Sequence, residues 1–143
     1  MTGDAVIVSA CLLGVPCRHD GRDQRDEGVL RALAGREVVP VCPEVMGGLP
    51  VPRPPAFFDG EGAGGRLVDA HGADVTLAFA RGAAAAVEAA RAFGARLAVL
   101  KQNSPSCGTL MTGTAAGRRP GQGVAARALA QAGLVVRGED QPW

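Results

Sequence analysis

One short stretch near the middle of the chain carries several kinds of reactive side chain. The segment Lys101–Gly108 places an ammonium, amide, hydroxyl and thiol groups within eight residues. Pro105 fixes its own φ and favours an extended Ser104, and Gly108 permits a tight exit. These groups therefore lie on a stiff loop, where functional residues are often found. A serine-rich surface turn with a buried structural cysteine is the alternative interpretation.

The cysteines are the second set of residues that could do chemistry. Three of the four follow apolar runs that have the composition of buried strands. They are Cys11 after Ala5–Ala10, Cys42 after Glu37–Val41, and Cys107 in the loop after Ala95–Leu100. Ligands bind outside the carboxyl ends of the strands in open parallel sheets, so we expect these thiols to meet at one edge. Cys17 could join them or lie beside them.

The segments between these strands have the patterns of helices. We expect helices from Asp26 to Ala34, from Asp74 to Phe93 and from Gly123 to Ala132, a hairpin of Phe57–Asp59 with Arg66–Asp69, and a last strand at Leu134–Arg137. Pro43–Pro55 has the composition of an ordered irregular loop, and Gly113–Gly123 that of a mobile one. Strands separated by helices predict an α/β protein, with a three-layer Rossmann-like fold and a mostly parallel sheet.

Three or four thiolates at one edge of a sheet suit zinc or an iron–sulfur cluster. The chain has no Cys-x-x-Cys pair, which argues against a zinc ribbon and against a thioredoxin-like redox pair. It has only two histidines, so mixed cysteine and histidine zinc sites have weak support. Three scattered ligands that leave a metal position open are typical of a catalytic site. Buried, inert thiols remain the alternative.

Composition excludes several other classes of function. The 143 residues suit a single domain, 1–143, with a net charge of +1 and therefore no general attraction to nucleic acid or membranes. Aromatic residues are only 3% of the chain, which argues against a base-stacking surface. The first residues do not have the pattern of a secretory signal, so we expect a cytoplasmic protein. The sequence does not fix the oligomeric state, and a homodimer is one option.

Four motifs spread over nearly the whole chain resemble those of the thiouracil desulfurase (TudS-like) family. They are Ser9–Gly14, Cys17–Gly21, Val41–Glu44 together with Gly48–Arg53, and Ser104–Gly108. Their order along the chain is also the family's order. One departure is His19, which stands where the family's Arg-x-Asp-Gly element is expected to have tyrosine.

The resemblance implies a [4Fe-4S] cluster held by three cysteines, which would be Cys11, Cys42 and Cys107. The fourth iron, without a protein ligand, would bind the sulfur of a thiocarbonyl substrate such as thiouracil or a thiolated pyrimidine nucleoside or nucleotide. The family removes that sulfur without net redox change and releases hydrogen sulfide. The family's acid–base residues carry over to Glu44 and Ser104.

The residue types are consistent with that chemistry. Glu44, two positions from a cysteine, could activate water as a general base, and Ser104 could relay a proton. Arg53, Lys101 and Ser106 are candidate substrate-binding residues. A small molecule is a better substrate than tRNA for a nearly neutral chain. The alternative is a non-catalytic iron–sulfur or zinc module, or a sulfur carrier, built on the same cysteines.

Overall fold

The computed structural model describes residues 5–59, 65–109, 111–114 and 117–143, and its centre is a parallel sheet of four strands. The strands of this sheet are β1 (Ala5–Ser9), β2 (Glu37–Val41), β5 (Leu97–Leu100) and β8 (Val135–Gly138). Their order across the sheet is β2-β1-β5-β8, and each neighbouring pair is parallel. The predicted parallel α/β fold is confirmed.

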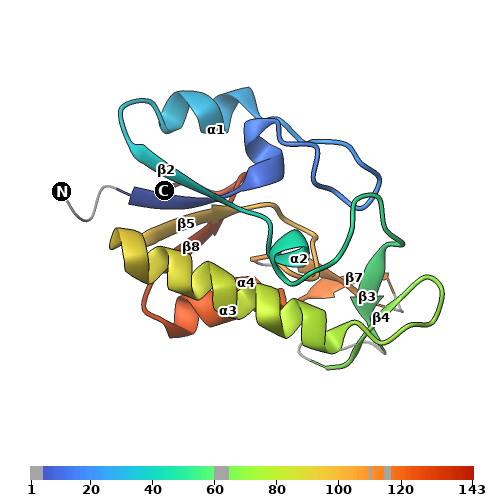
Figure 1. Ribbon diagram of the computed structural model, residues 1–143. Helices are drawn as coiled ribbons and strands as arrows, with labels where there is room; N and C mark the ends of the chain where they lie inside the picture. Colours follow the sequence, from blue (N-terminus) through green and yellow to red (C-terminus); the bar gives the residue numbers. More distant parts are fainter. Residues whose placement is uncertain (1–4, 60–64, 110, 115–116) are drawn as a thin grey trace.

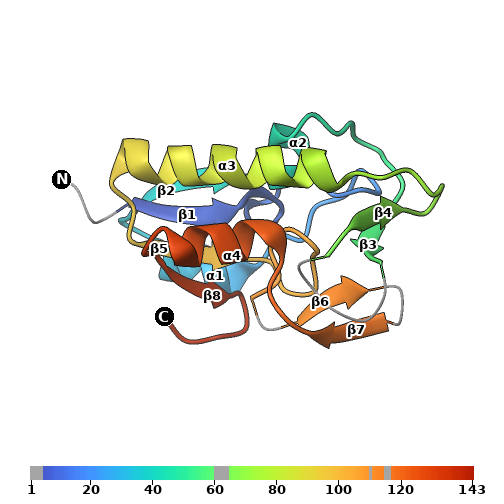
Figure 2. The same ribbon diagram turned by 90° about the horizontal axis from the view of Figure 1, so that it is seen from below.

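Helices cover both faces of this sheet (Figures 1 and 2). The helices are the short 3-10 helix η1 (Ala10–Leu13), α1 (Glu27–Ala32), α2 (Pro43–Met46), α3 (Thr76–Phe93) and α4 (Val124–Gln131). Helix α1 lies on one face, and α3 and α4 lie side by side on the other. The longest described helix, α3, has 18 residues, and no helix in the described ranges has the length and apolar composition of a membrane span.

Two apolar cores explain why the central strand is a continuous apolar run. Ala5 and Ile7 of β1 pack toward α3 and α4, whereas Val6 and Val8 pack toward α1. All four side chains are fully buried. A strand that is buried on both faces loses the alternation of apolar and polar residues, as expected for a parallel sheet between two helical layers.

Local signals set the ends of the helices. Asp26 caps α1 by accepting a hydrogen bond from the Val29 amide, and α3 ends at Gly94, which has a φ of 66°. Both ends agree with the sequence. Helix α2 is different, because Pro43–Pro55 was expected to be wholly irregular. Pro43 takes the first turn of a helix that follows β2 directly, a position where its missing N–H costs nothing.

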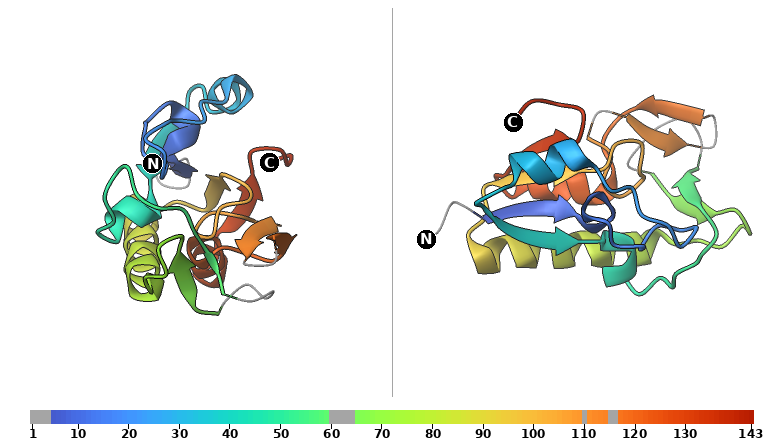
Figure 3. Two further views of the ribbon diagram at one scale, coloured as in Figure 1. Left: turned by 90° about the vertical axis from the view of Figure 1, so that its right-hand side faces the viewer. Right: turned by 90° about the horizontal axis from the view of Figure 1, so that it is seen from above.

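A second, smaller sheet lies beyond the carboxyl ends of the parallel strands (Figures 2 and 3). Its strands are β4 (Leu67–Asp69), β3 (Ala56–Phe58), β6 (Met111–Thr114) and β7 (Gly117–Pro120), in that order across the sheet. The predicted hairpin of β3 and β4 is confirmed. Gly113–Gly123 was expected to be a loop, whereas its described residues include strand residues, since β6 and β7 pair and β6 also pairs with β3; its mobility stays a prediction. Residues 115–116 lie outside the described ranges.

Candidate metal centre and active site

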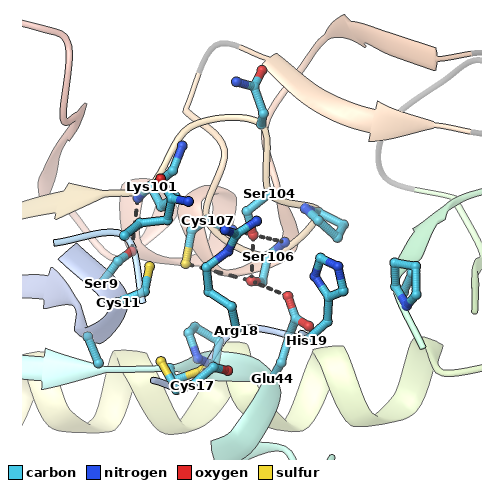
Figure 4. Close-up of a pocket in the computed structure, with 18 of the residues that line it drawn as sticks. Ser9, Cys11, Cys17, Arg18, His19, Glu44, Lys101, Ser104, Ser106 and Cys107 are labelled. Carbon is cyan, nitrogen blue, oxygen red and sulfur yellow. Dashed lines mark hydrogen bonds between the residues drawn. The ribbon is translucent and has the colours of Figure 1, made fainter. Parts of the chain in front are cut away.

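A cleft of about 530 Å³ opens at the carboxyl ends of the parallel strands (Figure 4). The strand order changes direction between β1 and β5, because β2 lies on one side of β1 and β5 and β8 lie on the other. Open α/β sheets bind ligands at such a point. The cleft is lined by all four cysteines and by polar side chains that include Ser9, Arg18, His19, Gln24, Glu44, Arg53, Lys101, Gln102, Asn103, Ser104 and Ser106. The predicted site residues therefore share one cavity.

Strand ends deliver three of the thiols to this cleft. Cys11 lies in η1 directly after β1, and Cys42 lies between β2 and α2. Cys107 lies in the loop that follows β5. None of the four cysteines forms a disulfide, and three are buried, with Cys42 partly exposed. Four free thiols around one cavity are a set of soft donors, which favours zinc, copper or iron–sulfur centres over hard cations.

The donors around the cleft can be compared with those that a single ion and a cluster need. In the described part of the chain, no three His, Cys, Asp or Glu side chains are close enough together to hold one metal ion. A single zinc ion would need its thiolate ligands about 2.3 Å from one point. A multi-iron cluster binds each thiolate through a different iron, so it suits thiols that are farther apart. The donor type and the room in the cleft fit such a cluster.

Burial strongly affects the thiols that line the cleft. Burial raises the pKa of Cys11 to about 11. It also raises the pKa of Cys107 to about 12, although hydrogen bonds with Ser9 and Ser106 act to lower this pKa. A hydrogen bond with the Cys17 thiol lowers the pKa of Cys42 to about 6 and raises that of Cys17. Metals bind the thiolate form, so loading Cys11 and Cys107 must release protons.

Cys17 lies directly beside Cys42. The carbonyl oxygen of Cys17 accepts hydrogen bonds from Arg53 Nη2, at 3.0 Å, and from Cys42 Sγ, at 3.7 Å. The main chain of Cys17 therefore helps to fix both a candidate ligand and a candidate active-site residue. Its thiol is next to the predicted ligand set, and its role as a ligand or a neighbour stays a prediction.

Close contact between two helices positions Glu44. A side chain at Gly82 of α3 would overlap the Pro43 carbonyl oxygen, and one at Gly47 would overlap the Ala78 carbonyl oxygen. The two glycines therefore let α2 rest directly on the backbone of α3. Glu44, in the first turn of α2, extends into the cleft opposite Cys11 and Cys107 (Figure 4).

Arg53 holds that carboxylate in place. Its Nε donates to Glu44 Oε1 at 2.9 Å, and its Nη1 and Nη2 donate to the carbonyl oxygens of Pro50 and Cys17. The side chain of Arg53 is 5% exposed and that of Glu44 is 15% exposed. Arg53 was expected to contact substrate, and that contact stays a prediction. What the structure shows is a guanidinium directed at Glu44.

Two serine hydroxyls extend the hydrogen bonding from Glu44. Ser106 Oγ donates to Glu44 Oε2 at 3.1 Å and lies 3.0 Å from Ser104 Oγ. Ser104 Oγ accepts from the amides of Ser106 and Cys107 at 3.1 and 3.0 Å. Because Ser104 accepts from two amides, its own proton is available to Ser106. Sequence patterns placed Ser106 only as a substrate contact and missed its position between Ser104 and Glu44.

Lys101 is the last predicted residue of the site, at the end of β5. Its amide donates to Ser9 Oγ at 2.9 Å, and its Nζ forms an ion pair of 2.9 Å with Glu139 Oε2. Neither Ser9 nor Glu139 was predicted from the sequence as a residue of the site. The signal for Glu139 was present, because an acidic residue follows the predicted last strand just as Lys101 follows the third.

Comparisons with known proteins agree with this geometry. The family model of the 2-thiouracil desulfurases matches residues 6–141. A Bacillus subtilis (strain 168) protein, the uncharacterized protein YbbK, is 37% identical over 146 residues, which cover 95% of this chain and 96% of that protein. A solved structure described as the [4Fe-4S]-dependent thiouracil desulfidase TudS is similar with a TM-score of 0.86 and 42% identity, and the match covers 96% of this chain and 92% of the other. The resemblance found in the four motifs is thus confirmed, and the chain belongs to the 2-thiouracil desulfurase family.

Proposed function

We propose that this protein is a desulfidase that removes sulfur from the thiocarbonyl group of a small thiolated pyrimidine such as thiouracil. The reaction consumes one water and converts C=S to C=O with release of H₂S, so no electron donor or acceptor is needed. The observation that carries the proposal is one cleft with three strand-end thiols on one side and a hydrogen-bonded carboxylate on the other.

A [4Fe-4S] cluster is the cofactor of this proposal. The family match and the cofactor of the solved relative support it, and so do the free thiols that line one cleft. Cys11, Cys42 and Cys107 would hold the cluster, with Cys17 beside them. When bound, a cluster with one iron free of protein ligands supplies a Lewis acid for the soft thiocarbonyl sulfur.

Glu44 is the proposed general base. Its carboxylate faces the cleft, and Arg53 holds one oxygen while the Ser106 hydroxyl holds the other. A fixed carboxylate can take a proton from the water that attacks the thiocarbonyl carbon. The Arg53 guanidinium lies 2.9 Å from one carboxylate oxygen and keeps the carboxylate in a fixed orientation toward the cleft.

Ser104 and Ser106 form the proposed path for the proton. The atoms Glu44 Oε2, Ser106 Oγ and Ser104 Oγ follow one another at 3.1 and 3.0 Å. A proton taken up at Glu44 can therefore be passed through the Ser106 hydroxyl to the Ser104 hydroxyl, and both hydroxyls lie in the loop that carries Cys107. We assign the transfer of a proton toward the leaving sulfur to Ser104, as expected from the sequence.

The size of the cleft and the net charge of the chain favour a small substrate. A cleft of about 530 Å³ is within the range for sites that bind small molecules. The net charge of +1 gives no general attraction to a polyanion such as tRNA. Whether a free base, nucleoside or nucleotide is preferred is for the assay to decide.

The test begins with anaerobic purification and cluster reconstitution, followed by measurement of iron and acid-labile sulfide. The loaded protein is then given a panel of thiolated bases, nucleosides and nucleotides, and released sulfide is measured. We expect bound iron and sulfide together with turnover of at least one pyrimidine. A protein that binds iron and sulfide but turns over nothing in the panel would instead be a cluster carrier, and one that binds zinc without sulfide would be a structural zinc protein.

A further inference from the structure

The last strand of the sheet brings a carboxylate to the base of the loop that carries Cys107. Gly138 of β8 pairs with Leu100 of β5 in parallel register. The next residue of each strand, Glu139 and Lys101, therefore leaves the sheet at the same edge. The topology thus places Glu139 beside the start of this loop, hereafter the Cys107 loop, Lys101–Thr109.

Both carboxylate oxygens of Glu139 are used by the Cys107 loop. Oε1 accepts a hydrogen bond of 2.7 Å from the Gln102 amide, and Oε2 forms the 2.9 Å ion pair with Lys101 Nζ. The side chains of Glu139 and Lys101 are 15% and 23% exposed. If either charged group lost its partner, the other would stay partly buried with its desolvation energy no longer offset by the ion pair. The Glu139 carboxylate and the Lys101 ammonium therefore stabilise each other.

Two further contacts join the residues after Glu139 to the same loop. Gln102 Nε2 donates to Asp140 Oδ1 at 3.4 Å, and Thr109 Oγ1 donates to Gln141 Oε1 at 2.7 Å. Within the loop, the Thr109 amide donates to Gln102 Oε1 at 3.1 Å. The segment Glu139–Gln141 therefore contacts the loop near both of its ends.

The other side of the Cys107 loop rests on elements that come earlier in the chain and on α4. Ser9 holds its first amide, and the amides of Val124 and Ala125 in the first turn of α4 donate to the carbonyls of Pro105 and Ser106. Between these supports lie Ser104, Ser106 and Cys107. A loop held from two sides presents its thiol and hydroxyls in one arrangement.

We propose that Glu139 is a positioning residue for the metal-binding loop, acting by pairing with Lys101 and by fixing the Gln102 amide. The inference rests on the proposed function, since it supposes that Cys107 binds the cluster. Glu139 acts through the loop. Without it, the Lys101 ammonium keeps the 3.2 Å hydrogen bond to the Gln102 carbonyl but loses its counter-charge, and the first turn of the loop loses an anchor.

The experiment measures how long the reconstituted protein keeps its cluster. Loss of the cluster's visible absorbance in the presence of a chelator is followed for the wild type, Glu139→Ala, Glu139→Gln and the double variant Lys101→Met with Glu139→Gln. The double variant removes both charges and keeps an amide oxygen for the Gln102 N–H. Glu88→Gln is the matched control, because Glu88 also pairs with a cation, Arg91, but its side chain is 74% exposed.

We expect the cluster to be lost about ten-fold faster in Glu139→Ala, the lower end of the effect of removing a residue that orients a metal ligand. Glu139→Gln should be impaired as well, and the double variant should return to within about two-fold of the wild type because no ammonium is left unpaired. Glu88→Gln should match the wild type. Circular dichroism checks the fold, and if Glu139→Ala does not fold, the two variants that contain Gln at position 139 carry the test.

Two results would overturn the inference. One is wild-type cluster lifetime in both single variants at position 139, and the other is a double variant as fragile as Glu139→Gln. Failure of the proposed function has a different signature and is seen in the wild type itself, which would then either bind neither iron nor labile sulfide or bind both and turn over no thiolated pyrimidine.

Discussion

The two sides of the cleft are built by different means. On the thiol side, Cys11 and Cys42 directly follow parallel strands, so the backbone of the sheet sets their positions, and Cys107 lies in the loop after a third strand. On the carboxylate side, Glu44 is placed by a four-residue helix and by side-chain contacts with Arg53 and Ser106. The positions of Cys11 and Cys42 come from regular hydrogen bonding, and that of Glu44 comes from particular side chains. Changes on the two sides should therefore have separable effects.

Removing a thiol should have the largest effect, because it removes a ligand. In Cys42→Ser a harder oxygen replaces the soft sulfur that iron–sulfur centres use. We expect iron and labile sulfide after reconstitution to fall to about a tenth of wild type or less, with no measurable desulfuration.

Cys17→Ser is the matched control, because the contact to Arg53 uses the carbonyl of Cys17. It should keep the cluster and most of the activity. Equal loss of iron in Cys42→Ser and Cys17→Ser would show that the Cys17 thiol also helps to hold the cluster.

Replacing the base should separate chemistry from cofactor binding. Glu44→Gln keeps the shape of the side chain but cannot take up the proton, so turnover should fall about 10²- to 10⁴-fold. Iron and sulfide content should stay at the wild-type level, as measured on the same preparation. A variant with wild-type turnover would assign the base to another group, and Glu88→Gln controls for the loss of a charge.

A methyl group at Gly82 should disturb the carboxylate side through the backbone. It would push the Pro43 carbonyl and α2 away from α3, which costs about 1–3 kcal/mol for overpacking. A displacement of Glu44 by about 1 Å could lower turnover by about 10²-fold.

Gly28→Ala is the control, since a Cβ at Gly28 in α1 would meet the side-chain oxygen of Asp26 at 3.3 Å and no backbone atom within 4 Å, and alanine is favoured over glycine in helices by up to about 1 kcal/mol. Urea unfolding measures both variants. Equal stability of Gly82→Ala and the wild type would contradict the close contact between α2 and α3.

Arg53→Lys should have the smallest effect of the four. Lysine keeps the charge but lacks the fork that reaches Glu44, Pro50 and Cys17 together. The loss of one charged hydrogen bond, about 1.5 kcal/mol, corresponds to a fall in turnover of about ten-fold with the KM nearly unchanged. A large rise in KM with an unchanged kcat would instead support the substrate contact that the sequence predicts for Arg53.

Much of the thiol side could be predicted from local patterns. The apolar runs before Cys11 and Cys42, the Asp26 cap and the Gly94 stop each act over a few residues, so they are visible in the sequence. They were enough to predict parallel strands and the meeting of thiols at their ends. The β6–β7 hairpin was missed because its glycines and arginines lack apolar alternation, and because β6 also pairs with β3, far away in the chain.

The sequence by itself determined the strands of the parallel sheet, the start of α1, the end of α3 and the residue types at the carboxyl edge of that sheet, because propensity, capping and hydrophobic periodicity are local. Only the tertiary structure decided which side chains meet there. Ser106 reaches Glu44, and Glu139 reaches Lys101, across long separations in sequence. Such contacts depend on strand order, on register and on two glycines that let α2 approach α3. The physical reason is that packing between distant segments fixes them, and no pattern within a few residues records it.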